Sequence, residues 1–339
     1  MQKNTLSLIS RYRTPLMGFA ALWVLFFHEW RSLFGDSILG QAERFMTGMG
    51  YFGVDIFFFL SGMGLIYAIG KYSTLEFYKR RFGRILIPGV LALTLRALLV
   101  GWDLKFYFAT LVGYHFWTLY IYTSMWFYFA IMTLYLLFPL YYRVFCKVKN
   151  KYLFTAAVLI VWYFLSNALY GIQRFDLYGF TNRIPIFLTG VLAGSMLRDK
   201  KEISFTWVHL ILCFVLLAVG FYVNYLANYL KRFILVPSSE CFLADFLITI
   251  ACVGLLPRLF CLLEKSLIGN RIVKIFTFLG TMSLELYCIQ EIFMRGIQEL
   301  MYPYFHDAII NVVNFAITIT AAFLLRKICD YLHKVLPFR

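Results

Sequence analysis

The chain has 339 residues, of which 62% are hydrophobic and only 14% are charged. A soluble domain carries about a quarter charged residues, so this composition excludes a soluble globular protein. The formal net charge of +15 would suggest a nucleic-acid partner in a soluble protein, but here the basic residues lie between apolar segments, and we expect no nucleic acid to bind.

Apolar stretches close to the ~20 residues that span a bilayer recur along the whole chain. They predict an all-α polytopic membrane protein with a single domain, residues 1–339, and no appended soluble domain. We expect about ten transmembrane helices, at residues 14–34, 47–70, 84–101, 124–145, 152–170, 184–198, 206–228, 240–257, 273–297 and 308–329. The aromatic segment 102–123 is expected to be interfacial or re-entrant rather than an eleventh span.

The positions of the basic residues support this topology and predict its orientation. With ten spans and both termini cytoplasmic, 23 of the 32 Lys and Arg residues lie at cytoplasmic helix ends, in keeping with the positive-inside rule. An eleventh span would invert every segment after residue 123 and remove this asymmetry. We therefore expect a multi-pass protein of the cytoplasmic membrane, surrounded by membrane lipids.

Two titratable side chains lie inside the first two expected spans, His28 in "ALWVLFFHEWR" and Asp55 in "FGVDIFFFLSG". Ionisable residues inside a membrane are costly and usually functional. If these helices meet the outer surface near residues 34 and 47, His28 lies ~9 Å and Asp55 ~12 Å below it. At a shared depth Asp55 orients His28, which then serves as a general base. The alternatives are that His28 is a hydrogen-bonded interface residue, and that Asp55 caps the backbone or pairs with an arginine.

Three arginines stand at the cytoplasmic start of the third expected span, in "EFYKRRFGRILIP". Arg81 and Arg84 are three residues apart, which places them on one face of a helix, with Arg80 beside them. Guanidinium groups bind phosphate bidentately, so this face predicts a phosphate-binding site. The alternative is that each arginine only anchors the helix on the cytoplasmic side.

Several other polar residues lie in apolar segments, where they must face the interior of the helical bundle. Arg183, at an outer helix start, is either part of the site or an interface anchor. The seven cysteines are scattered without a CxxC or Cys/His cluster, so we expect no metal site. The candidate supporting residues are Ser61, Trp126, Arg183, Ser283, Glu285 and Gln290.

Six segments in this order resemble a known family: "LFFH", "FGVDIFFFLSG", "FYKRRFGRILIP", "WFYFAIMTLYLLFP", "RIPIFLTGVLAG" and "LGTMSLELYCIQ". The ordered set resembles acyltransferase family three, which comprises integral membrane O-acyltransferases of sugars, over roughly residues 14–295. Any one of these motifs is weak, and it is their order that is specific. The chain has Met17 where many members carry arginine, and Gln290 where many carry histidine.

The resemblance implies an enzyme that takes an acyl group, usually acetyl, from cytoplasmic acyl-CoA and passes it to a hydroxyl of a cell-envelope or exported glycan. The helix-one histidine of the family corresponds to His28, and its Arg-x-x-Arg motif to Arg81 and Arg84. Its "GVD…FFxxSG" element corresponds to Gly53, Val54, Asp55, Phe58, Phe59, Ser61 and Gly62.

The mechanism that we expect begins with the acyl-CoA phosphates bound by Arg81 and Arg84, with help from Arg80. His28, oriented by Asp55, deprotonates the acceptor hydroxyl, which attacks the thioester. Ser61 and Trp126 are the candidates for the oxyanion donor. The resemblance implies acyl-CoA as a co-substrate and a glycan or lipid-linked glycan as the acceptor, and we expect no permanently bound cofactor. The alternative function is a glycan or lipid transporter, which would not depend on coenzyme A.

Overall fold

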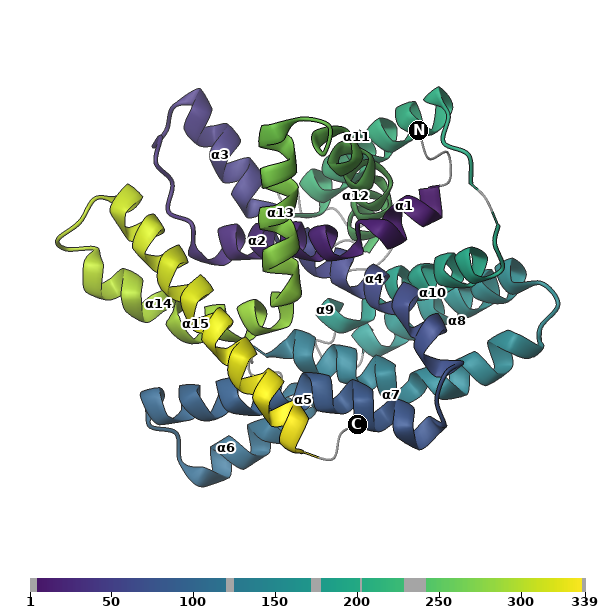
Figure 1. Ribbon diagram of the computed structural model, residues 1–339, viewed down its shortest axis with the longest axis horizontal. Coiled ribbons are helices and arrows are strands. Elements are labelled where there is room, and N and C mark those ends of the chain that lie inside the picture. The colour runs from purple at the N-terminus through teal and green to yellow at the C-terminus, as the bar shows by residue number, and fades with distance from the viewer. Residues whose placement is uncertain (1–4, 120–124, 172–177, 202, 229–241, 337–339) are drawn as a thin grey trace.

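Figure 1 shows a computed structural model of the chain, which describes residues 5–119, 125–171, 178–201, 203–228 and 242–336. These residues form helices, with no β-strand among them. In chain order the elements are α1 (Thr5–Arg11), α2 (Arg13–Glu29), α3 (Ile38–Gly48), α4 (Phe52–Ile69), α5 (Thr74–Val100), α6 (Leu104–Leu111), η1 (His115–Leu119), α7 (Trp126–Lys147), α8 (Lys151–Gly171), α9 (Tyr178–Thr181), α10 (Ile184–Arg198), α11 (Trp207–Asn228), α12 (Phe242–Leu263), α13 (Leu267–Thr281), α14 (Ser283–Met301) and α15 (Asp307–Val335). The prediction of an all-α membrane protein is confirmed.

The number of spanning helices differs from the expected ten. Seven helices in the described part of the chain are long and apolar enough to cross a membrane, or eight if the bent pair α13–α14 counts as one span. Three expected spans account for the difference. α2 has only 17 residues and α10 only 15, and the axis of the expected span 273–297 bends by 68° between α13 and α14.

The aromatic segment 102–123 does not form a single long helix in its described part. It contains α6, of 8 residues, and η1, of 5 residues, both far shorter than a span, while residues 120–124 lie outside the described ranges. Asp103 caps α6 by accepting a hydrogen bond from the Phe106 N–H at 2.8 Å. α6 then lies against α5, where the hydroxyls of Tyr107 and Thr94 are 2.8 Å apart.

Helix α4 lies at the centre of the bundle, between α2 and α10 (Figure 1). It is apolar on all sides and almost entirely buried, as expected of a helix that is surrounded by other helices. Glycines allow α10 to approach it closely. A Cβ built on Gly190 would overlap the Phe59 carbonyl of α4, and one built on Gly62 would overlap the Phe187 carbonyl of α10.

The same kind of contact sets the position of α2 against its neighbours. A Cβ on Gly53 of α4 would overlap the Ala20 carbonyl, which places these two residues at the same level of antiparallel helices. α13 crosses α2 where Gly18 faces the Phe276 carbonyl and Gly280 faces the Thr14 carbonyl. These close approaches decide which side chains of α2, α4 and α13 lie together.

Replacing Gly190 with alanine tests the close crossing of α4 and α10. The new methyl group would meet a backbone oxygen that cannot move without shifting a helix, so we expect a loss of about 1–3 kcal/mol in the free energy of unfolding. Gly70→Ala is the matched control, because no atom lies within 4 Å of the position that its Cβ would take and its φ of −76° suits alanine. Thermal unfolding in detergent measures both variants. Equal stability of Gly190→Ala and Gly70→Ala would contradict the close crossing.

Helix α5 carries the three adjacent arginines and has clear ends. Ser73 caps it by accepting a hydrogen bond from the Glu76 N–H at 3.2 Å. The helix ends at Gly101, whose φ of +73° is the left-handed conformation that glycine adopts at helix C-termini. The 27 residues between these ends hold the arginines in one continuous helix.

Candidate active site

His28 and Asp55 do not pair, so this expectation is wrong. Gly53 lies level with Ala20, and Ala20 is eight residues from His28, or about 12 Å along a helix axis. Because α2 and α4 are antiparallel, Asp55 is further still from His28. The expected pairing assumed one helix from residue 47, but α3 ends at Gly48 and α4 begins at Phe52 after a turn, which changes the depth of Asp55.

Asp55 instead binds Arg183, one of the alternatives left open by the sequence. Arg183 Nε donates to Asp55 Oδ1 at 2.8 Å, and the arginine side chain is 1% exposed. Arg183 Nη1 donates to the Gly179 carbonyl at 3.1 Å and lies 3.7 Å from Asp245 Oδ2. The guanidinium carbon is 5.4 Å from the ring centroid of Trp126. Asp245 was not among the predicted residues, although it stands in an apolar helix just as Asp55 does.

His28 lies near the end of α2, beside a second group of buried polar residues. Its ring is half-buried, with its centroid 4.8 Å from that of Phe27. The next residue, Glu29, is fully buried, and the Thr318 hydroxyl of α15 lies 3.2 Å from each of its carboxylate oxygens. Gln298 of α14 donates to the Glu29 carbonyl at 2.7 Å. Glu29 could have been recognised in the sequence by its position next to His28.

A buried cavity of about 230 Å³ brings together four of the candidate residues, Ser61, Arg81, Arg84 and Ser283. Arg81 and Arg84 both face it, as their spacing predicted. The complete lining is Arg13, Met17, Phe57, Ser61, Arg81, Arg84, Ile85, Phe127, Ile131, Tyr135, Gly280, Ser283, Leu284 and Tyr287. The walls therefore come from six helices, with arginines gathered at one end, which we call the arginine end.

Arg13 also lines the cavity, although it was not among the predicted site residues and was counted only as a basic residue at a cytoplasmic helix end. Its Nη2 is 3.5 Å from the Leu60 carbonyl and would lie 2.9 Å from a Cβ on Gly64, so glycine makes room for the guanidinium. Met17 stands one turn further along the same face of α2 and also lines the cavity. The resemblance places an arginine at position 17, and Arg13 lies one helical turn before that position. This spacing could have indicated Arg13 as a site residue.

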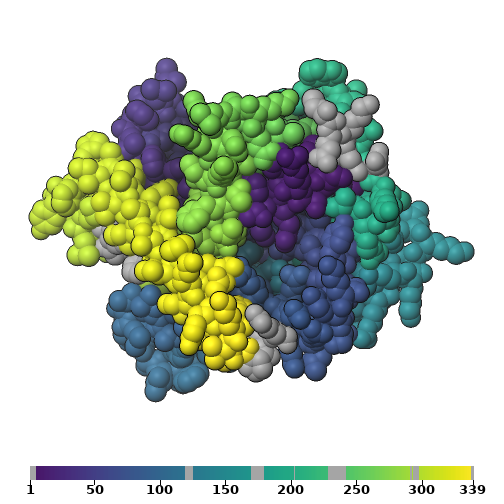
Figure 2. All heavy atoms as spheres, in the orientation of Figure 1, coloured from purple at the N-terminus to yellow at the C-terminus, as the bar shows by residue number. Residues whose placement is uncertain are grey.

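A second cavity, of about 680 Å³, shares Arg81 and Arg84 with the first and opens at the surface. In Figure 2 the surface is hollowed between α15, in yellow, and the blue segment that includes α4. Its charged lining is mainly basic and also includes one described acidic residue: Arg80, Arg81, Arg84, Lys334, His333 and Asp330. The arginine end of the buried cavity thus shares two of its residues with a basic opening at the surface.

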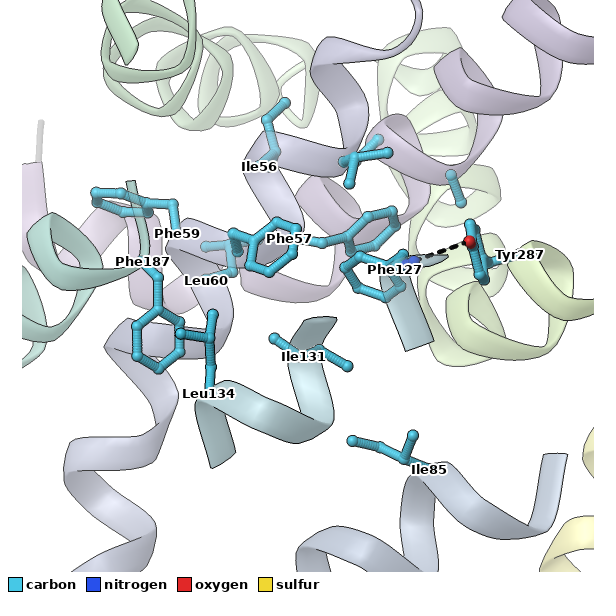
Figure 3. Packing of buried hydrophobic residues seen from close by; sticks show 14 of the residues in the cluster. Ile56, Phe57, Phe59, Leu60, Ile85, Phe127, Ile131, Leu134, Phe187 and Tyr287 are labelled. Carbon is cyan, nitrogen blue, oxygen red and sulfur yellow. Dashed lines mark hydrogen bonds between the residues drawn. The ribbon is translucent and has the colours of Figure 1, made fainter. Parts of the chain in front are cut away.

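Three aromatic side chains of the cavity lining lie close together, and we call them the aromatic layer: Phe57, Phe127 and Tyr287 (Figure 3). The ring centroid of Phe127 is 6.0 Å from that of Phe57 and 5.0 Å from that of Tyr287. The Phe127 N–H donates to the Tyr287 hydroxyl at 3.3 Å. Phe57 stands one turn from Ser61 on the side away from Arg13, so this layer lies between the cavity and the His28 end of α2.

The model of the family named acyltransferase domain (Acyl_transf_3) matches residues 16–327, nearly the whole chain. The chain belongs to acyltransferase family 3. Searches of curated proteins and of solved structures found no match. The family membership makes the protein a membrane acyltransferase, and a reaction of that kind requires a binding place for an acyl donor.

Several candidate residues of this family 3 acyltransferase lie away from the buried cavity. Arg80 pairs with Glu76, with Nη2 2.9 Å from Oε1, and lies 4.3 Å from the ring centroid of Tyr72, so it belongs to the surface opening alone. Gln290 is buried in α14 but does not line the cavity. Trp126 contacts Arg183 instead. Of the two candidate oxyanion donors, Ser61 therefore lines the cavity and Trp126 does not.

Glu285 also stands outside the cavity, where it contacts two arginines. Its Oε1 lies 3.8 Å from Arg84 Nη2 and 3.4 Å from Arg326 Nη1, and its side chain is fully buried. Arg326 Nε in turn donates to Asp330 Oδ2 at 2.9 Å. Glu285 thus forms ion pairs with Arg84 and Arg326 beside the arginines that the two cavities share. No group of metal-ligating side chains occurs in the part of the chain that the structure describes.

Proposed function

We propose that this acyltransferase moves an acyl group, acetyl in the simplest case, from acyl-CoA to a hydroxyl of a cell-surface or exported glycan. The observation that carries this proposal is the arginine end of the cavity, where Arg13, Arg81 and Arg84 meet the basic surface opening. Coenzyme A carries several phosphate groups on its nucleotide and an extended pantetheine arm. A basic opening beside a smaller cavity that is lined by both apolar side chains and serines suits this shape and charge.

The phosphates are proposed to bind where the two cavities join. Arg81 and Arg84 face both cavities, and guanidinium groups hold phosphate oxygens through paired charge-assisted hydrogen bonds. Arg80 and Lys334 add positive charge at the opening. Glu285 forms an ion pair with Arg84 but does not line the buried cavity.

The orientation proposed for the membrane follows from the same basic residues. Placing the basic opening and both termini on the cytoplasmic side of the cell membrane follows the positive-inside rule and gives cytoplasmic acyl-CoA access to the cavity. Once the reactive native cysteines, such as the exposed Cys146, are replaced, a cysteine introduced at residue 149 should react only with reagents that reach the cytoplasm. Labelling of that position from outside alone would reverse the proposed orientation.

His28 remains the proposed general base, although it lies on the other side of the aromatic layer. It is eleven residues from Met17, or about 16 Å along the helix axis, so it faces a different depth from the arginines. The thioester must therefore pass beyond the aromatic layer to meet the acceptor, or the acyl group must cross in a second step. Asp55 has no part in this step, because it binds Arg183.

Replacing His28 with alanine tests both the reaction and its base. We expect turnover to fall by about 10²–10⁴-fold while acetyl-CoA affinity is unchanged, because the phosphates bind elsewhere. The measurement is CoA release from labelled acetyl-CoA by purified protein, with and without envelope glycans. His209→Ala is the matched control, since His209 is exposed and pairs with Thr206.

Two outcomes of this experiment would reject parts of the proposal. Full turnover by His28→Ala would show that His28 is not the general base. Glycan movement across the membrane by wild-type protein without any use of acetyl-CoA would instead favour the transporter alternative.

A further inference from the structure

Two serine hydroxyls line the middle of the buried cavity without a partner among the described residues. Ser61 of α4 is 7% exposed and Ser283 of α14 is 8% exposed, and both line the cavity. In the described ranges, no side chain or backbone group forms a hydrogen bond to either hydroxyl. Buried polar groups are nearly always hydrogen-bonded, because leaving one unpaired costs free energy. Both residues line the cavity, so a ligand bound there can form hydrogen bonds with their hydroxyls.

The bend between α13 and α14 places Ser283 at the cavity wall. α14 begins at Ser283, and Met282 before it provides no side-chain cap. The first residues of a helix carry backbone N–H groups that lack partners within the helix. Ser283 and Leu284, the first two residues of this 19-residue helix, both line the cavity. The bend therefore adds hydrogen-bonding capacity beside the Ser283 hydroxyl.

The rest of the cavity wall limits the chemistry of the ligand. Between the arginine end and the aromatic layer the wall includes the apolar side chains of Met17, Ile85 and Ile131 beside the two serines. A sugar ring has hydroxyls on every side and would leave most of them unpaired there. A slender chain that is largely hydrocarbon, with few and separated polar groups, can contact these apolar side chains and also pair with the two hydroxyls.

We propose that Ser61 and Ser283 hydrogen-bond the amide groups of the pantetheine arm, and so select a CoA-type thioester as the acyl donor. This proposal rests on the proposed function, because it takes acyl-CoA as the ligand whose phosphates lie at the arginine end. The pantetheine arm follows those phosphates and carries two amides along an otherwise apolar chain. Acyl phosphates and acylated lipids lack these amides, so they would leave both hydroxyls unpaired.

Two probes separate the arm from the nucleotide: coenzyme A, and adenosine 3′,5′-bisphosphate, which has no arm. For the variant Ser61→Ala/Ser283→Ala we expect coenzyme A affinity to fall by about 25-fold, or about 5-fold for each hydroxyl lost. The affinity for adenosine 3′,5′-bisphosphate should not change. Calorimetric titration of the purified full chain in detergent measures both affinities.

A matched control and the single variants keep this test decisive. Ser166→Ala removes a buried hydroxyl that donates to the Tyr163 carbonyl at 3.0 Å and does not line the cavity, so both affinities should stay as in wild type. If the double variant does not fold, the two single variants take its place. A similar loss for both probes, or an unchanged coenzyme A affinity, would overturn the serine assignment. Wild-type protein that binds no coenzyme A would overturn the proposed function itself.

Discussion

Replacing Arg81 and Arg84 together with alanine is expected to weaken acyl-CoA binding by about 10²–10⁴-fold. A hydrogen bond to a charged group contributes about 1.5–3 kcal/mol, and every 1.4 kcal/mol is a factor of ten in affinity. Both side chains face the junction of the two cavities, so their loss removes two phosphate contacts at once. The fold should survive, because Arg84 is partly exposed and Glu285, its partner on α14, keeps its ion pair with Arg326.

The measurement is acetyl-CoA affinity of the purified variants in detergent. Lysine at both positions should restore only part of the affinity, because an ammonium group lacks the bidentate geometry of guanidinium. Arg11→Ala is the matched control: Arg11 pairs with Glu264 at the surface and lines neither cavity. If the double variant bound acetyl-CoA as tightly as wild type, Arg81 and Arg84 would serve only to anchor the helix on the cytoplasmic side.

Replacing Arg183 with alanine is expected to lower the free energy of unfolding by about 3–5 kcal/mol. The substitution leaves the buried carboxylates of Asp55 and Asp245 without the cation that lies between them, and removing one partner of a buried ion pair has this cost. The three residues come from α4, the start of α10 and α12, so the loss should loosen the contact of these helices.

A triple variant separates the charge from the shape of this cluster. Arg183→Met, Asp55→Asn and Asp245→Asn together remove all three charges at similar volume, and we expect them to recover most of the lost stability. Apparent melting temperatures in detergent provide the comparison. Arg11→Ala serves as the control, because its pair with Glu264 is 53% and 32% exposed and should contribute only about 0–1 kcal/mol.

The opposite pattern would change the role of this cluster. If Arg183→Ala melted as wild type does but lost turnover, Asp55, Arg183 and Asp245 would belong to the reaction rather than to the helix packing. We expect Asp55→Asn alone to lower the free energy of unfolding, as Arg183→Ala does, because Asp55 lies more than about 12 Å along the helix axis from the level of His28.

The sequence predicted the properties that depend on local pattern. Long apolar stretches predicted a helical membrane protein, and the order of short motifs along the chain indicated the family. The three-residue spacing of Arg81 and Arg84 placed both on one face, and both line the same two cavities. Such properties follow from helix geometry, which needs only neighbouring residues.

Only the tertiary structure decided which polar residues meet. Asp55 and Arg183 are 128 residues apart, and their contact depends on the close crossing of α4 and α10. The depth of Asp55 depends on the turn between Gly48 and Phe52, because moving the start of a helix by five residues shifts each side chain by about 7.5 Å along its axis. Arg13 enters the cavity because Gly64, on another helix, leaves room for it. An apolar pattern predicts that a helix is buried. Which atoms it packs against depends on long-range contacts, which a local pattern does not predict.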